Sequence, residues 1–190
     1  MDLKGSKTEK NLLIAFAGES QARNRYNFFA SVAKKEGYEA ISGVFADSSE
    51  NEREHAKREF KFLEGRPVEI TATYPAGKIG NTAEGLKAAA AGEHYEWTEM
   101  YPGFAKIAQE EGFDAIASAF THIARAEKGH EARFLKWLSA LEAGTVFKSP
   151  QPVKWRCRNC GYIHEGTEPP QACPACTHPR GYFEIIKEDY

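Results

Sequence analysis

Apolar side chains recur at helical spacing through most of the first 143 residues. In the first such stretch, one face carries Leu12, Ala15, Ala22, Tyr26 and Phe29, which are three, four or seven positions apart. This spacing is typical of an amphipathic helix, because 3.6 residues complete each turn. The same pattern along the chain predicts four helices, near residues 6–35, 38–64, 82–110 and 113–143.

Glycine and proline positions indicate how these helices end or bend. Gly37 and Gly112 lie where paired helices would be joined, and glycine suits the left-handed residue that follows a helix end. Pro102 lies inside the third predicted helix. Since proline removes a backbone donor and crowds the preceding turn, it predicts a kink there.

The helical region contains an internal duplication. When the chain is shifted by 75 positions, residues 26–63 align with residues 101–138, and fourteen of the 38 aligned positions are identical. The sequence Ala-Gly-Glu at 17–19 also recurs at 91–93, with a one-residue slip. The region is therefore two copies of a helical hairpin.

The segments between and after the hairpins divide the chain. Residues 65–82 hold prolines and glycines that cannot continue a helix, and a link of this length fits a four-helix bundle with one long crossover. Ser149-Pro150-Gln151-Pro152 marks the next boundary. We therefore predict a bundle domain at 1–148 and a small domain at 149–190, which is too short to bury a useful core without a metal.

Composition and charge narrow the function classes. The chain has 190 residues, 42% hydrophobic, with 25 basic and 27 acidic side chains and a net charge of −2. The chain has no stripe of basic residues interleaved with aromatic ones, which a nucleic-acid-binding surface would need. It also has no apolar run long enough to span a membrane. The N-terminal sequence lacks a signal pattern, so we expect a cytoplasmic protein. In that compartment, two C-x-x-C pairs indicate metal binding rather than disulfides.

A repeated carboxylate and histidine pattern predicts a metal site in the bundle. Each copy has one Glu on its first helix and a Glu-x-x-His on its second, and residues three apart project from one helix face. Carboxylates facing inward without counter-charges would cost several kcal/mol each. Two multivalent cations would balance them, as in di-iron and di-manganese carboxylate bundles. The candidate ligands are Glu19, Glu52 and His55 from the first copy, and Glu93, Glu127 and His130 from the second.

Three further residues accompany this set. Glu96 lies three positions after Glu93 and offers a seventh ligand, whereas Ala22 stands at the related place in the first copy. Tyr26 and Tyr101 lie further along the same helices, seven residues after Glu19 and eight after Glu93. They are either ordinary core tyrosines or hydrogen-bond donors to the ligand carboxylates. The remaining histidines have no partner at ligand spacing and are expected to be surface or structural residues: His94, His122, His164 and His178.

The four cysteines predict a second metal site. Cys157, Cys160, Cys173 and Cys176 follow the spacing C-x2-C-x12-C-x2-C, which lets two tight loops supply four thiolates to one ion. Zinc ribbons share this spacing. Trp155 and Phe183 could form an aromatic shell around the ion, and this favours iron over zinc without deciding between them.

These segments together resemble the rubrerythrin family over nearly the whole chain. The resemblance is carried by residues 16–26 (FAGESQARNRY), 52–55 (EREH), 91–96 (AGEHYE), 127–130 (EKGH), 155–162 (WRCRNCGY) and 173–176 (CPAC). It implies a ferritin-like four-helix bundle with one long crossover, mainly α, followed by a rubredoxin-like four-cysteine domain of short β-strands and loops.

The resemblance also implies an activity: a non-haem peroxidase that reduces hydrogen peroxide to water and protects against oxidative stress. It implies a di-iron centre, Fe2+/Fe3+ and oxo-bridged when oxidised, and one iron bound by the four cysteines. By the family pattern, Glu19 binds the first iron, Glu93 and His130 bind the second, and Glu52 and Glu127 bridge them. The first iron exchanges Glu96, its ligand when oxidised, for His55 when reduced.

The expected partners also follow from the resemblance. Family members are commonly homodimers in which the four-cysteine iron of one subunit serves the di-iron site of the other, with electrons from rubredoxin or NAD(P)H-dependent reductases. One alternative is a ferritin-like ferroxidase that binds iron for storage, although storage has no need of an appended electron carrier. Another is a structural bundle with a zinc ribbon.

Overall fold

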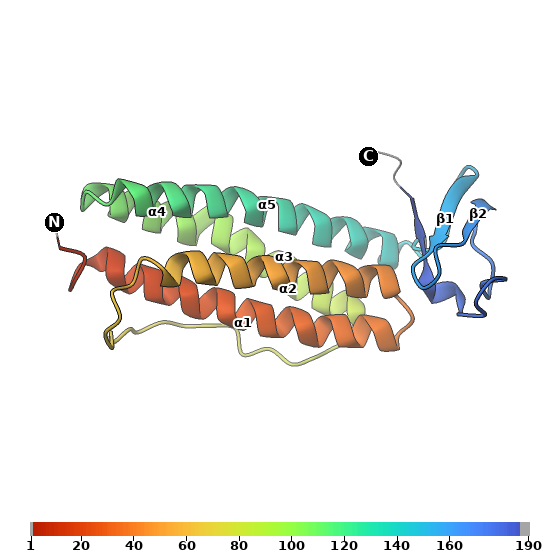
Figure 1. Ribbon diagram of the computed structural model, residues 1–190, viewed down its shortest axis with the longest axis horizontal. Coiled ribbons are helices and arrows are strands. Elements are labelled where there is room, and N and C mark those ends of the chain that lie inside the picture. The colour runs from red at the N-terminus through yellow and green to blue at the C-terminus, as the bar shows by residue number, and fades with distance from the viewer. Residues whose placement is uncertain (1, 187–190) are drawn as a thin grey trace.

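The computed structural model describes residues 2–186, and these form a long helical bundle with a small sheet domain at one end (Figure 1). The bundle consists of α1 (Lys7–Lys35), α2 (Glu39–Phe60), α3 (Thr82–Tyr95), α4 (Tyr101–Glu110) and α5 (Asp114–Glu142). A π-helix, Glu96–Met100, joins α3 to α4, so that these three segments act as one long helix. The four predicted helical segments and the bundle they form are confirmed.

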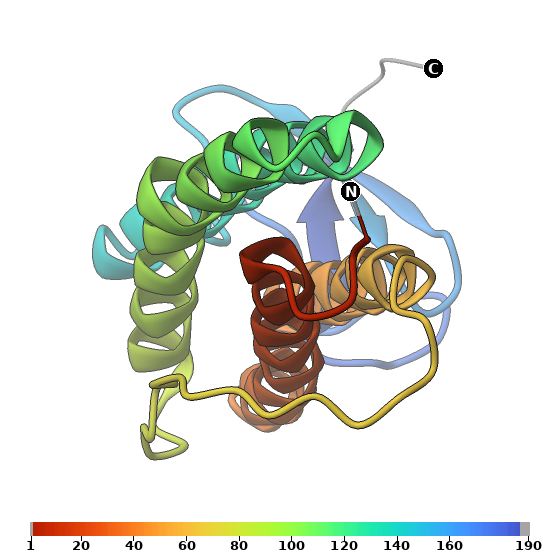
Figure 2. The ribbon, with the colours of Figure 1, turned by 90° about the vertical axis from the view of Figure 1, so that its left-hand side faces the viewer.

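The ends of the helices have local causes. Ser6 accepts a hydrogen bond from the backbone of Glu9 at the start of α1, and Asn81 and Glu84 form a reciprocal capping box at the start of α3. Gly37 and Gly112 both adopt positive φ, 83° and 79°, directly after helices. The crossover between α2 and α3 runs along the bundle beside α1 and returns the chain to the end from which α2 began (Figures 1 and 2).

The third helical segment differs from the prediction. We expected a kink caused by Pro102, but the α-helical pattern is interrupted earlier, at the π-helix, and Pro102 lies in the first turn of α4, where proline is tolerated. The cause is visible in the duplication: Glu19 and Tyr26 are seven residues apart, whereas Glu93 and Tyr101 are eight apart. A π-turn accommodates one extra residue and keeps both side chains on the inner face. The second helix is also shorter than predicted, ending at Phe60.

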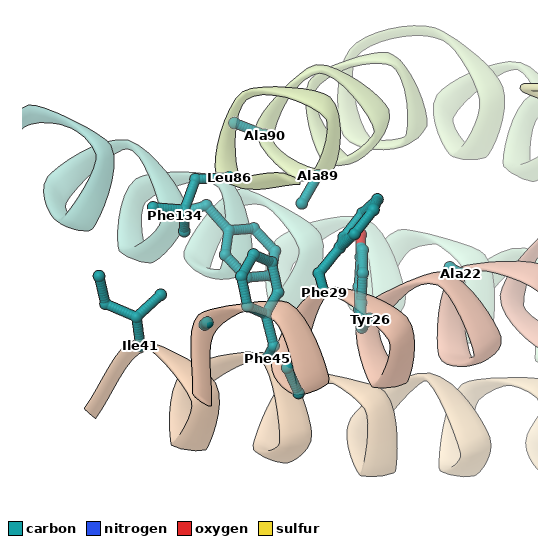
Figure 3. Packing of buried hydrophobic residues seen from close by; sticks show 11 residues of the cluster. Ala22, Tyr26, Phe29, Ile41, Phe45, Leu86, Ala89, Ala90 and Phe134 are labelled. Atoms are coloured by element: carbon teal, nitrogen blue, oxygen red, sulfur yellow. The ribbon is translucent and has the colours of Figure 1, made fainter. Parts of the chain in front are cut away.

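Two apolar clusters fill the bundle. One, near the sheet domain, is built around Tyr26, Phe45 and Phe134, whose rings pack against one another (Figure 3). The other is built around Leu12 and Phe120 towards the far end. In the sequence of α1, Glu19 lies between Ala15 of the second cluster and Ala22 of the first. The predicted ligands therefore form a polar layer between two dry cores.

The sheet domain is a three-stranded antiparallel sheet with the order β2-β1-β3: β1 is Val153–Cys157, β2 is Ile163–Gly166 and β3 is Phe183–Ile185. A short 3-10 helix, Arg180–Tyr182, precedes β3. The predicted boundary at 148/149 stays a prediction, and residues 1 and 187–190 of the two predicted domains lie outside the described residues.

This small domain packs against the turn between α1 and α2. A Cβ on Gly181 would lie only 2.2 Å from the carbonyl oxygen of Gly37, and the Arg158 guanidinium occupies the space beside Gly43 of α2. The rings of Tyr38 and Phe147 stack with centroids 6.0 Å apart. Within the described residues, no helix has both the length and the apolar character needed to cross a membrane.

Candidate metal centres

The polar layer of the bundle brings six of the predicted ligands together. Ligand atoms of Glu19, Glu52, His55 and Glu127 all lie within 4.8 Å of one another, and so do those of Glu52, Glu93, Glu127 and His130. Glu52 and Glu127 belong to both groups. All four helical segments contribute, and each carboxylate is at most 1% exposed. The geometry is that of two adjacent ion sites sharing two carboxylates.

The two histidines lie between carboxylates. His55 Nδ1 is 2.7 Å from Glu127 Oε1 and 3.1 Å from Glu52 Oε2, and His130 Nδ1 is 2.7 Å from Glu127 Oε2 and 3.2 Å from Glu52 Oε1. Burial alone would lower the pKa of each imidazole. Hydrogen bonding to Glu127 and Glu52 outweighs it and raises the pKa of His55 to about 10 and of His130 to about 9. Without a metal ion, the neighbouring carboxylates therefore favour the protonated form of both imidazoles at neutral pH.

Burial acts on the carboxylic acids in the opposite direction, towards a higher pKa. Burial, followed by repulsion from neighbouring carboxylates, raises the pKa of Glu19 and of Glu93 well above its ordinary value. The second oxygen, Oε2, of both residues is buried without a hydrogen-bond partner. A buried oxygen without a partner destabilises the folded protein, and a cation bound in each ligand group would provide that partner. The residues therefore fit a pair of metal ions with oxygen and nitrogen ligands.

Glu96 lies close to the cluster but outside both groups among the residues described. It is the first residue of the π-helix and is 8% exposed. Burial and then the charges of Glu127 and Glu52 raise its pKa to about 8, while Arg25 opposes the shift. The structure thus places a fifth carboxyl group beside the four clustered carboxylates and two histidines, on the segment that departs from α-helical geometry.

The two tyrosines donate hydrogen bonds across the bundle. Tyr26 Oη of α1 lies 2.5 Å from Glu93 Oε1 of α3, and Tyr101 Oη of α4 bonds to Glu19 of α1. Both rings are at most 2% exposed. Of the two readings left open by the sequence, the geometry agrees with hydrogen-bond donors that orient ligand carboxylates.

Two residues near the cluster were not predicted. Glu59 of α2 is 1% exposed, and its Oε1 lies 2.9 Å from Tyr101 Oη. Its position, seven residues after Glu52 on the same helix face, was the available signal. Asn51 Oδ1 lies 3.1 Å from His130 Nε2, which leaves Nδ1 directed at the carboxylates. This contact fixes the ring and so selects which nitrogen faces the site.

The other histidines lie away from the layer. His94 pairs with Glu131 at 2.9 Å on an exposed face, and His122 bonds to the backbone of Ser118. His178 lies beside the cysteine site, where its Nδ1 is 3.0 Å from the carbonyl oxygen of Cys176. None of these three belongs to the groups that could hold an ion.

The four cysteine sulfurs converge in the sheet domain. Their Sγ atoms lie within 4.8 Å of one another, with 3.8 Å between Cys157 and Cys176 and 3.6 Å between Cys160 and Cys173. A tetrahedron with metal–sulfur bonds of about 2.3 Å has edges of about 3.8 Å, so the sulfurs fit one ion. None of these four cysteines is in a disulfide.

Matching loops present these sulfurs. Gly161 N bonds to Cys157 O, and Thr177 N bonds to Cys173 O, each at 2.8 Å. The residue after each second cysteine has positive φ, 79° at Gly161 and 62° at Thr177. Trp155 and Phe183 are buried against Cys157 and Cys173, as predicted, whereas Cys160 is exposed. The site therefore has one dry side and one open side.

Comparison with known proteins agrees with both sites. The family model "Rubrerythrin" matches residues 10–138, and the model "Rubrerythrin, rubredoxin-like domain" matches residues 155–184. The chain is 60% identical to a rubrerythrin of Porphyromonas gingivalis over 188 residues, covering 99% of this chain and 94% of the relative. It is also 60% identical to a rubrerythrin of Nitratidesulfovibrio vulgaris over 184 residues, covering 97% and 96%.

A solved structure gives the same result for the fold. Nigerythrin in a mixed-valence state aligns with a TM-score of 0.62 at 31% identity, covering 96% of this chain and 90% of that chain. The ferritin-like bundle and the rubredoxin-like domain are thereby confirmed. The two clusters correspond to a di-iron site with carboxylate and histidine ligands and to a four-cysteine iron site, and the family match favours iron over zinc. The chain belongs to the rubrerythrin family.

Proposed function

We propose that the protein is a non-haem di-iron peroxidase that reduces hydrogen peroxide to water. The observation that carries this proposal is the buried layer in which two groups of ligands share Glu52 and Glu127. Such a layer can hold two iron ions side by side, and such a pair supplies two electrons to one bound oxygen species when reduced. The apolar clusters on both sides of the layer keep bulk water from it.

We assign the ligands by group. Glu19 and His55 would hold one ion, Glu93 and His130 the other, and Glu52 and Glu127 would bridge both. Glu96 would replace His55 on the first ion when that ion is oxidised, because a carboxylate suits ferric iron and a neutral imidazole suits ferrous iron. Its position at the start of the π-helix, outside both groups, supports a ligand that enters and leaves.

The surrounding residues position these ligands. Tyr26 and Tyr101 each donate a hydrogen bond to a terminal carboxylate, Glu93 and Glu19 respectively, and so fix the orientation of that carboxylate. Asn51 holds the ring of His130 from behind. The protons that both imidazoles carry without metal must leave on loading, so metal binding releases protons.

We further propose that the four-cysteine iron returns electrons to this layer, and that it serves the bundle of a second subunit in a homodimer. Two observations support this. Cys160 is exposed at the open side of the cysteine site, and the sheet domain lies at the end of its own bundle, beyond a complete apolar cluster (Figure 1). Rubredoxin or an NAD(P)H-dependent reductase would supply the electrons. Four cysteines that bind a metal instead of forming disulfides suit the reducing cytoplasm.

Replacing Cys160 by Ser tests the electron supply. The reduced variant should consume one equivalent of peroxide as the wild type does, because the bundle is intact, but it should lose steady-state turnover with a reductase. The exposed residue Glu165 provides the matched control, since Glu165→Gln changes the same domain without touching a sulfur. Undiminished steady-state turnover in Cys160→Ser, at equal iron content of the bundle, would refute the proposed relay.

A further inference from the structure

Glu59 is a buried acid that the proposed ligand set does not use. It lies on α2, one turn beyond His55, and its side chain is 1% exposed. One oxygen, Oε1, is 2.9 Å from Tyr101 Oη, and the other, Oε2, has no hydrogen-bond partner. An acid in this position cannot be explained as a solvated surface residue.

The contact pattern of Tyr101 fixes the direction of the hydrogen bonds. Tyr101 Oη contacts Glu19 on one side and Glu59 on the other, yet a phenol carries a single proton. Once Glu19 binds a cation, it is ionised and can only accept. The phenolic proton then goes to Glu19, and the contact with Glu59 is a hydrogen bond only if Glu59 donates it.

We propose that Glu59 is a positioning residue, held as a neutral carboxylic acid, which donates a hydrogen bond to Tyr101 and thereby commits the Tyr101 proton to Glu19. The inference rests on the proposed function only in taking Glu19 as a metal ligand. Glu59 does not itself touch either ion site. Its role is to ensure that Tyr101 donates its proton to Glu19 and accepts a hydrogen bond from Glu59, so that the Glu19 carboxylate keeps a fixed orientation.

The surroundings of Glu59 favour the neutral form of its carboxyl group. Burial raises the pKa of Glu59 well above its ordinary value, and Tyr101 and then His55 oppose the shift. The groups that face Glu59 from the packed elements are mostly acidic or neutral, and they come from α1, α2, α4, α5, the π-helix and the crossover: Glu19, His55, Tyr101, Glu127, Glu96 and Tyr74. His55 is the one basic group among them, and it loses its proton when it binds metal.

The other half of the bundle provides an internal control. Tyr26 corresponds to Tyr101 in the duplication, and the residue that corresponds to Glu59 is Phe134. The ring of Phe134 packs edge-on against Tyr26 with centroids 5.3 Å apart and offers no donor (Figure 3). The acid is therefore not required to bury the tyrosine, and its presence on one side only distinguishes the Glu19 site from the Glu93 site.

Infrared spectroscopy of the anaerobic, ferrous-loaded protein, in which His55 is the proposed ligand, tests the protonation directly. At pH 7 we expect the carbonyl band of a protonated carboxyl group, shifted by deuterium, that is present in the wild type and missing from Glu59→Gln. Glu9 is buried as well, but it pairs with Arg66 at 2.5 Å and is present in both proteins. A difference spectrum without this band overturns the proposal.

Anaerobic calorimetry with ferrous iron tests the consequence. Glu59→Leu removes the donor and should weaken one of the two bundle sites by about 10-fold or more, as loss of support behind a ligand does. Glu59→Gln keeps an N–H donor and should bind within about 2-fold of the wild type. Phe134→Leu, the matched change in the other half, should leave both affinities unchanged.

Two results contradict the proposal: unchanged affinities in Glu59→Leu, or an equal loss in Glu59→Gln and Glu59→Leu. If Glu59→Leu does not fold, the infrared result and the affinity of Glu59→Gln still decide. Neither experiment uses peroxide. A protein without peroxidase activity would therefore leave this proposal intact, and a negative result here would leave the peroxidase proposal intact.

Discussion

The first hairpin, α1 and α2, and the second, α3 to α5, each contribute a Glu from one helix and a Glu-x-x-His from the next. Behind these shared ligands the two copies differ. The second has an extra residue, absorbed by a π-helix that begins at Glu96, and the first has Glu59 where the second has Phe134. The comparison indicates that the two copies share six ligands, whereas the seventh, Glu96, the helix geometry around it and the residues behind the tyrosines differ and make the two ion sites unequal.

The largest expected effect is the loss of bound metal ions when a ligand is removed, and it should be greater for a ligand that both sites share. Glu127 belongs to both candidate groups, and Glu93 to one. We expect Glu127→Ala to abolish binding of both ions in the bundle and Glu93→Ala to abolish one. Metal analysis of the two variants, with the four-cysteine iron counted separately by its absorption, measures this. Equal stoichiometry in the two variants would remove the distinction.

The free energy of unfolding of the metal-free bundle should depend on pH. His55 and His130 have folded pKa values raised to about 10 and about 9, so their stabilising contribution is complete below about pH 6.5 and is lost as the pH rises through these values. Glu19, Glu93 and Glu96 also have raised pKa values in the folded protein. Above about pH 4.5 these carboxyl groups are ionised in the unfolded chain but still protonated in the folded one, so the free energy of unfolding falls as the pH rises.

Both groups act in the same direction, because the native state binds more protons than the unfolded state. Denaturant unfolding of the metal-free protein should therefore give a free energy of unfolding that falls from pH 6 to pH 10. The metal-loaded protein should not show this fall, since the ions have replaced the protons. A metal-free stability that rises with pH over this range would show that the protons do not reside in the cluster.

Replacing each tyrosine by Phe should lower the free energy of unfolding, and the losses should differ by a smaller amount. Tyr101→Phe leaves two buried carboxyl groups, Glu19 and Glu59, without their shared partner, whereas Tyr26→Phe leaves one, Glu93. With about 1–3 kcal/mol for each buried group left unsatisfied, we expect the metal-free protein to lose about 2 kcal/mol more in the first variant. Chemical denaturation at pH 6 compares them, and equal losses would show that Glu59 finds another partner.

Much of the fold and the ligand set could be predicted because both follow from short-range spacing. Glu-x-x-His places two ligands on one helix face, and its repetition within a duplicated frame predicts where the two copies meet. The four cysteines likewise carry their geometry in two local loops. For these residues, the sequence pattern and the side-chain convergence agree.

What could not be predicted depends on long-range packing. The one-residue slip near Glu93 was visible, but whether a kink, a bulge or a π-turn would absorb it depends on which face must stay buried. Glu59 looks like an ordinary helical glutamate until Tyr101, 42 residues away in sequence, is packed against it. The contact of Gly181 with the turn at Gly37 likewise joins distant segments.

The central claim is that the acidic layer between the two apolar clusters holds an iron pair that reacts with peroxide. Iron analysis combined with Mössbauer spectroscopy, before and after one equivalent of peroxide, tests it most directly, in Cys160→Ser so that no electrons are resupplied. The account predicts two ferrous ions per chain in the bundle and the conversion of both to ferric by a single equivalent. A bundle without iron, or ferrous ions unchanged by peroxide, would contradict it.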